Sequence, residues 1–162
     1  MRTFIGSPPR EGAQEAPGRM VGRRFESPRV NYELGPLPSN WEFQEGEKGD
    51  AAYYSKEHKA LISVRSVCAR YSEARLQNLA RDLLWGFTDR EILREKTIQF
   101  AEREALDLEA DAKLDGVPVH IWVRVLKKNR CIFDFTLVAP PEHFDEARPA
   151  FISLLEGFRL AE

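Results

Sequence analysis

Two runs of alternating polarity flank an Asp-Gly pair in the middle of this chain. Leu and Ala occupy the even positions from 106 to 114, charged residues occupy the odd ones, and VPVHIWVRVL follows Asp115-Gly116. Alternation with a period of two through Asp-Gly is typical of a β-hairpin with a two-residue turn. We therefore predict antiparallel pairing of residues 106–114 with 117–125, in which Leu108 faces Val123 and Asp107 faces Arg124.

A third strand is predicted at Cys131–Val138, after a turn at Lys128-Asn129, because Asn tolerates a positive φ. This register would place Trp122 opposite Phe135 and Arg124 opposite Phe133. One face of the resulting meander is almost wholly apolar and needs a covering helix. Its one charge, Asp134, should be paired or lie near an end of the sheet.

The flanking segments predict further strands and two helices. Strands are expected near residues 31–34, 51–57, 60–70 and 92–98. An apolar stripe over residues 76–87, preceded by Ser72 as N-cap, predicts one helix, and a stripe over 144–158 predicts another, with Pro149 in its first turn. The fold class is therefore α+β, an antiparallel sheet of about six strands flanked by two main helices.

Residues 1–29 differ in composition from the rest of the chain, with four prolines, four glycines and six arginines against three acids. Such a segment buries little apolar surface, so we expect a disordered basic tail at 1–29 and a folded domain at 30–162. The tail is interpreted as a linker, with contact to membrane lipids or a partner as the alternative.

Charge and cysteine content limit the classes of function. The net charge of −2 gives no basic footprint for nucleic acid, and no apolar run reaches the length of a membrane span. The N-terminus lacks the apolar core of a secretory signal, which favours a cytoplasmic location, or a periplasmic or envelope location if a signal has been removed. Cys68 and Cys131 are interpreted as free packed thiols, and a disulfide is the alternative.

The candidate binding residues lie on the second face of the meander. If this face is open, Trp122, Phe133 and Phe135 line a groove for a peptide or an apolar helix, with Arg124 and His120 at its polar rim. If the second helix covers the face, the same aromatic residues are core and the charges pair at the rim. Both possibilities follow from the pattern alone.

Signals for catalysis are weak. His120 beside Asp111 could form a catalytic dyad, but a salt bridge is the simpler interpretation. Asp107, Glu109 and Asp111 alternate at steps of about 7 Å along one strand, too wide for one cation, and the chain has no glycine-rich phosphate loop. We therefore expect no catalytic residues, no metal and no cofactor, and a protein that is not an enzyme.

Four motifs carry a resemblance to a known superfamily. They are LPSNW at 37–41, the LDGVPV turn at 114–119, the hairpin at 125–140, and the segment at 144–159 that ends in RPAFISLLEGFR. Over residues 30–160 the chain resembles the PsbP/DcrB-like superfamily, an α/β/α sandwich with an antiparallel sheet. The superfamily includes extrinsic photosystem II subunits, exported bacterial lipoproteins and chaperones of type VI secretion effectors.

This resemblance implies a non-enzymatic protein-binding module, adaptor-like or secretion-chaperone-like. A homodimer is also implied, because the effector chaperones dimerise around apolar helices. The alternative is an exported or envelope-associated scaffolding protein of lipoprotein type. The Arg- and Pro-rich tail departs from the chaperones, and the chain has no lipobox cysteine.

Overall fold

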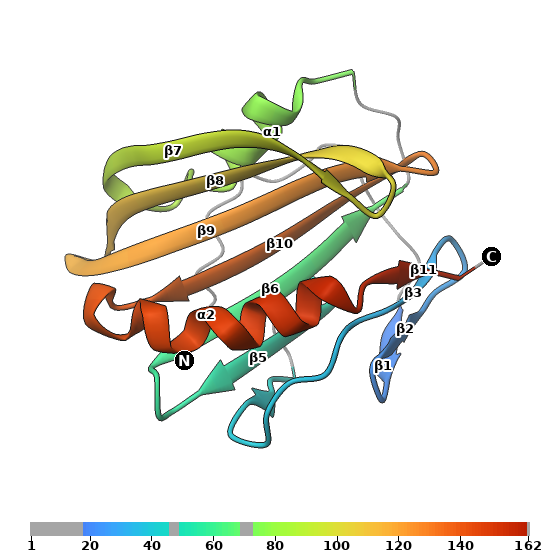
Figure 1. Ribbon diagram of the computed structural model, residues 1–162, viewed down its shortest axis with the longest axis horizontal. Helices are drawn as coiled ribbons and strands as arrows, with labels where there is room; N and C mark the ends of the chain where they lie inside the picture. The colour runs from blue at the N-terminus through green and yellow to red at the C-terminus, as the bar shows by residue number, and fades with distance from the viewer. Residues whose placement is uncertain (1–17, 46–48, 69–72, 162) are drawn as a thin grey trace.

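The computed structural model describes residues 18–45, 49–68 and 73–161, which form two antiparallel sheets and two helices (Figure 1). The larger sheet has seven strands in the order β4-β5-β6-β10-β9-β8-β7, and the smaller has the order β1-β2-β3-β11. The elements are β1 (Arg19–Val21), β2 (Arg24–Glu26), β3 (Asn31–Glu33), β4 (Glu42–Phe43), β5 (Ala51–Ser55), β6 (Ala60–Val67), α1 (Leu76–Asp82), β7 (Thr88–Phe100), β8 (Arg103–Leu114), β9 (Val117–Lys128), β10 (Cys131–Ala139), α2 (Pro141–Glu156) and β11 (Arg159–Leu160).

The predicted hairpin around Asp115-Gly116 is confirmed. β8 and β9 pair as expected, with Leu108 opposite Val123 and Asp107 opposite Arg124. Asp115 and Gly116 have φ values of 51° and 83°, which are the left-handed conformations that a two-residue turn of this kind requires. The local pattern therefore decided this register without help from the rest of the fold.

The predicted register between β9 and β10 was wrong by two residues. The turn is at Asn129-Arg130, with φ values of 54° and 67°, so that Lys128 still belongs to the strand and pairs with Cys131. As a result Trp122 faces Leu137 and Arg124 faces Phe135. Because the side-chain period of a strand is two, the assignment of residues to faces is unaffected.

Each face of the large sheet carries its own apolar core. On one face, Val123 and Val125 pack with α1 residues such as Leu79. On the other, Trp122, Phe133 and Phe135 pack against α2, which crosses the sheet in Figure 1. Asp134, on the α1 face, is 4% exposed and accepts a hydrogen bond of 3.2 Å from Nε of Arg65, which lies opposite it on β6, so the expected pairing is confirmed.

Both helices differ in extent from the prediction. α1 is only Leu76–Asp82, with Arg75 as N-cap, and the predicted cap Ser72 lies outside the described residues. α2 begins at Pro141, and Pro149 lies inside the helix, so its predicted first-turn role is wrong. Pro141 takes that position instead, because proline at the start of a helix loses no intrahelical hydrogen bond. No described helix has the length and apolarity of a transmembrane span.

Part of the expected disordered tail is ordered. β1 and β2 form a hairpin within residues 18–29, and β2 pairs with β3. Phe25 is 5% exposed and stacks on Tyr32 with ring centroids 5.1 Å apart. The expected boundary at residue 30 is therefore wrong for residues 18–29, because one buried aromatic side chain anchors the segment. Residues 1–17 lie outside the described residues.

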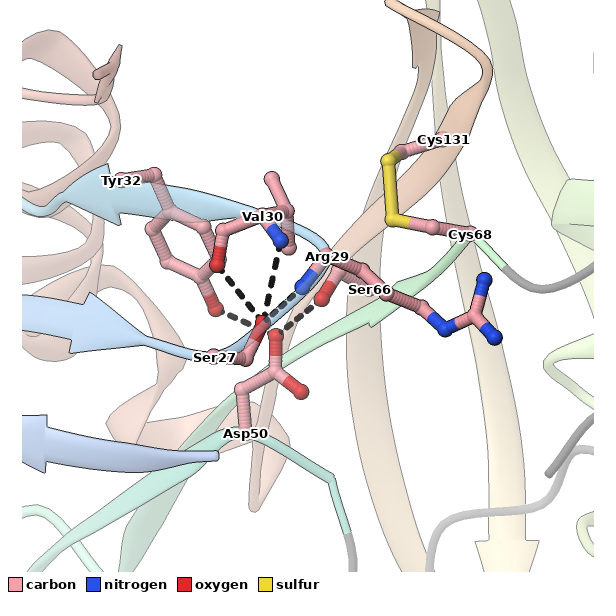
Figure 2. The surroundings of a disulfide bond; sticks show 8 residues. All are labelled: Ser27, Arg29, Val30, Tyr32, Asp50, Ser66, Cys68 and Cys131. Atoms are coloured by element: carbon pink, nitrogen blue, oxygen red, sulfur yellow. Dashed lines mark hydrogen bonds between the residues drawn. A yellow bond between two sulfur atoms is a disulfide. The ribbon is translucent and has the colours of Figure 1, made fainter. Parts of the chain in front are cut away.

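The two cysteines form a disulfide, so the interpretation as free thiols was wrong (Figure 2). Cys68 follows β6 and Cys131 begins β10. The ladder pairs their neighbours Val67 and Ile132, and this places the Cα atoms of the two cysteines 4.2 Å apart. The residues are 63 positions apart in sequence. Their proximity is a consequence of strand order, which spacing in the sequence does not reveal.

Candidate functional site

The predicted aromatic groove is closed. Trp122 is 5% exposed, and Phe133 and Phe135 are fully buried. The indole of Trp122 packs edge-on against Phe151 of α2 at 4.9 Å between ring centroids, and Phe158 covers Phe133 and Phe135. The expectation of an open groove at these residues is wrong, because α2 covers the sheet face that carries them.

Arg124, predicted at the rim of that groove, is held by a carboxylate. Its Nε and Nη2 donate to the two carboxylate oxygens of Asp107 at 2.7 and 2.9 Å. The guanidinium also lies 4.6 Å from the ring centroid of Phe100. A bidentate pair of this kind satisfies the charge of both partners. Arg124 and Asp107 therefore link β9 to β8 beside the core that α2 covers.

His120 lies between two carboxylates of β8. Its Nε2 lies 2.9 Å from Glu109 Oε1 and its Nδ1 lies 2.8 Å from Asp111 Oδ1, while Phe144 packs edge-on against the ring at 4.2 Å. The hydrogen bond to Glu109 raises the pKa of His120, although burial opposes it, and Asp111 raises it further. A ring with both nitrogens facing carboxylates is best satisfied as an imidazolium that donates twice. The salt-bridge interpretation of His120 and Asp111 therefore fits the geometry, and a general base does not.

Glu109 is the centre of this charged network. It is 6% exposed, and Arg148 of α2 donates to both of its oxygens at 3.2 and 3.3 Å, while Arg94 of β7 also donates to it. Burial raises the pKa of the Glu109 carboxyl, but the hydrogen bonds from His120 and Arg148 and the charges of both arginines outweigh burial and lower it to about 2. One ionised carboxylate on β8 therefore joins that strand to β7, β9 and α2.

A second polar cluster, which the sequence analysis missed, lies near the disulfide (Figure 2). The Tyr32 hydroxyl and the Ser66 hydroxyl each donate to Asp50 Oδ2 at 2.6 Å. Burial, reinforced by the charge of Asp50, raises the pKa of Tyr32 well above its ordinary value. The phenol therefore stays protonated and links the small sheet to β6. Nothing in the sequence places these residues together, because they come from three separate segments.

The most exposed of the long strands in the large sheet is β7. The sequence predicted a strand at 92–98, and the structure extends it to Thr88–Phe100, with most of its residues exposed. β7 is the last strand of the sheet and pairs only with β8 among the described strands. Exposed apolar side chains gather at its start: Trp85 is 64%, Leu93 49% and Ile92 37% exposed.

Metal-binding geometry is absent from the described part of the chain, where no three His, Cys, Asp or Glu side chains are grouped so that they could hold an ion. The acidic residues Asp107, Glu109 and Asp111 instead engage arginine and histidine partners. The arrangement holds elements together, and none of its groups is poised for nucleophilic or acid-base chemistry.

Comparison with known proteins finds similarity in structure only. No family model matches the chain, and no curated protein matches it in sequence. LpqN, which is involved in cell envelope biogenesis in Mycobacterium tuberculosis, superposes with a TM-score of 0.61 at 11% identity, over 84% of this chain and 87% of that protein. The cyanobacterial PsbP (CyanoP) of Synechocystis sp. PCC 6803 gives 0.56 at 16% identity, over 80% and 86%.

A third structure, PA94 of Pseudomonas aeruginosa, gives a TM-score of 0.50 at 11% identity, over 86% of this chain and 92% of that protein. Identities this low establish the fold and leave function to the residues of each chain. The order of strands and helices that the sequence motifs predicted agrees with these superpositions. The chain is an α+β protein with the PsbP-like fold.

Proposed function

We propose that this chain is a non-enzymatic protein-binding module that receives an extended segment of its partner along the free edge of β7. The observation that carries the proposal is the length and exposure of that edge. β7 has 13 residues and is exposed along most of its length, whereas β4 at the opposite edge has only two. Natural proteins usually shorten or cover sheet edges, because an open edge is a template for pairing with another chain.

The second half of β7 presents a regular set of hydrogen-bonding groups. Ala101 and Glu102 have φ values of 52° and 67°, so a tight turn joins Phe100 and Arg103 as a hydrogen-bonded pair. Because such pairs alternate along an antiparallel ladder, the N–H and C=O groups of Glu95, Thr97 and Gln99 point away from β8. These groups are available to an added strand.

The first half of β7 is irregular and suits side-chain contacts. The register with β8 shifts between Thr88 and Glu91 and again between Ile92 and Arg94. Irregularities of this kind twist an edge and interrupt its pairing. Leu93 lies in this half and Trp85 precedes the strand by three residues; both side chains are exposed and can supply apolar anchors. Together the two halves can accept backbone from a partner at one end and side chains at the other.

The absence of enzymatic activity is supported by the state of the titratable groups. Asp107 and Glu109 are buried and paired with cations, and both ring nitrogens of His120 face carboxylates. Catalysis would require one of these groups to exchange a proton with a substrate, and each is committed to a structural partner. The envelope and PsbP neighbours of the fold also agree with a scaffold.

An exported, envelope-associated scaffold is favoured over a cytoplasmic chaperone by one observation, the disulfide Cys68–Cys131. Disulfides persist in oxidising compartments and are rare in the cytosol, where thiols are kept reduced. The neighbour LpqN is itself described as involved in envelope biogenesis. We therefore replace the expected cytoplasmic location with an extracytoplasmic one.

The edge proposal is tested with a photo-crosslinking amino acid at position 97. Crosslinked products from native cells are identified by mass spectrometry, and the purified partner is titrated against the wild type, Thr97→Pro and Thr97→Val. Proline removes one outward N–H without breaking the ladder to β8, and valine keeps it. Binding at least tenfold weaker for Thr97→Pro, with Thr97→Val unchanged, supports the proposal. Equal affinities, with both variants folded, contradict strand addition.

A second copy of this chain is one outcome of the same experiment. If the crosslinked product is a homodimer, sedimentation equilibrium of the wild type and Thr97→Pro measures the loss of affinity between the two copies. Location is tested by lysing cells in acid, which traps the thiol state, and then alkylating the denatured protein with a maleimide-polyethylene glycol before and after reduction. Protection of both cysteines until reduction supports an oxidising compartment, and immediate modification contradicts it.

A further inference from the structure

A cluster of cations at one end of the large sheet surrounds a small pocket. The β7–β8 turn at Ala101-Glu102 and the β9–β10 turn at Asn129-Arg130 lie at this end (Figure 1). The pocket has a volume of about 260 Å³. Its lining is Arg103, Lys127, Lys128, Asn129, Arg130, Cys131 and Ile132.

Four of the seven lining residues are cationic and none is acidic. The whole chain has a net charge of −2, so this concentration of positive charge is local. The Glu102 carboxylate lies 3.7 Å from Lys128 Nζ, but its side chain is 92% exposed. A water-exposed carboxylate screens its neighbour weakly and leaves the potential of the pocket positive.

The two lysines are held in place by the backbone. Lys128 Nζ donates to the carbonyl oxygen of Ala101 at 2.5 Å, and Lys127 Nζ donates to that of Ala74 at 2.5 Å. Only 17% of the Lys128 side chain is exposed. An ammonium has three donors, so the Lys128 contact to Ala101 positions the charge without using all of its hydrogen-bonding capacity.

The two arginines are of a different kind. Arg103 and Arg130 are exposed, and neither forms an ion pair with any carboxylate of the described residues. Arg130 also has a φ of 67°, a conformation that a non-glycine residue adopts only where the turn demands it. Planar guanidinium groups bind phosphate oxygens through two parallel hydrogen bonds, whereas ammonium groups add point charge.

We propose that this pocket binds a phosphate group, with Lys128 as a fixed cation and Arg103 and Arg130 as guanidinium clamps. Lys127 is the preceding residue of β9, so its side chain points to the opposite face of the sheet and does not take part. A phosphate dianion would relieve the repulsion among Lys128, Arg103 and Arg130 and would engage the exposed guanidinium groups of the two arginines. The chemistry is the same for a small soluble phosphate ester and for the headgroup of an anionic phospholipid. The site is separate from the β7 edge, so it is independent of the proposed partner binding.

The test uses the purified chain with two probes. Inorganic phosphate is titrated by NMR at constant ionic strength, and vesicles of phosphatidylglycerol with phosphatidylcholine are compared with vesicles of phosphatidylcholine alone in a sedimentation assay. The test variant is Arg103→Gln with Arg130→Gln. The control is Arg90→Gln with Lys113→Gln, which removes the same charge near the opposite end of β8.

The expected result is that the wild type and the control bind one probe with equal affinity, while the test variant binds at least tenfold more weakly. Shifts with inorganic phosphate at the pocket residues identify a soluble ligand, and binding to anionic vesicles without phosphate shifts identifies a lipid headgroup. Binding of neither probe overturns the proposal. An equal loss in the test variant and the control also overturns it, because it would reflect net charge alone.

Discussion

Glu109 is the residue whose replacement should report most directly on how the fold is held together. Glu109→Gln keeps the size of the side chain and removes its charge. The carboxylate accepts hydrogen bonds from His120, Arg148 and Arg94, and its pKa falls from 4.5 to about 2. A fall of this size corresponds to about 3 kcal/mol of stability at neutral pH.

Solvent screening reduces that figure. The Arg94 side chain is 52% exposed and that of Arg148 is 30% exposed, so both can regain water when the carboxylate is replaced. We therefore expect Glu109→Gln to lower the free energy of unfolding by about 2 kcal/mol at neutral pH. Glu104→Gln on the same strand is the control, because Glu104 is exposed, and its effect should stay within about 0.5 kcal/mol.

The pH dependence gives the sharper test. Because the folded-state pKa of Glu109 lies below its unfolded value, its contribution is present above pH 4.5 and is lost as the pH falls toward about 2. The pKa of His120 is raised from 6.5, so its contribution is present below that value and is lost as the pH rises through the folded-state pKa. The two contributions together favour mildly acidic conditions.

Urea denaturation followed by circular dichroism, between about pH 9 and pH 3, measures both effects. The wild type should lose stability on the acid side more steeply than Glu109→Gln, so that the difference between the two proteins narrows as the pH falls below 4.5. Parallel curves for the two proteins, or an equal loss in Glu104→Gln, would refute the argument that Glu109 joins β8, β7 and α2.

Three further changes probe the core and the cross-link. Trp122→Ala should cost about 3–5 kcal/mol, whereas Trp122→Phe should cost less than about 2 kcal/mol, because the buried indole Nε1 has no hydrogen-bond partner among the described residues; urea midpoints distinguish the two variants. Phe25→Ala should cost about 3 kcal/mol by the same assay, and a neutral effect would contradict the packing of β2 on Tyr32. Replacing Cys68 and Cys131 by serine opens a cross-link between residues 63 positions apart, and the thermal midpoint should fall by an amount equivalent to about 2–4 kcal/mol.

The hairpin of β8 and β9 shows what the sequence determined alone. Alternation over residues 106–125 and a turn at Asp115-Gly116 are local signals, and they specify both register and faces because a one-residue slip would expose every apolar side chain. The strand at β7 and the stripe of α2 are local signals of the same kind. The resemblance to the PsbP/DcrB-like superfamily added the layer order, and the two cores on opposite faces of the large sheet confirm it.

Local sequence signals could not predict the candidate site. A strand face bearing Trp122, Phe133 and Phe135 can be an open groove or a core, and only the position of α2 decides which. The partners of Glu109 come from β7, β9 and α2, and the disulfide joins strands that become neighbours only when β6 pairs with β10. The sequence by itself determined the strands, their faces and the fold class, because those depend on near neighbours in the chain. The tertiary structure decided which surfaces are covered, because coverage depends on where distant segments pack.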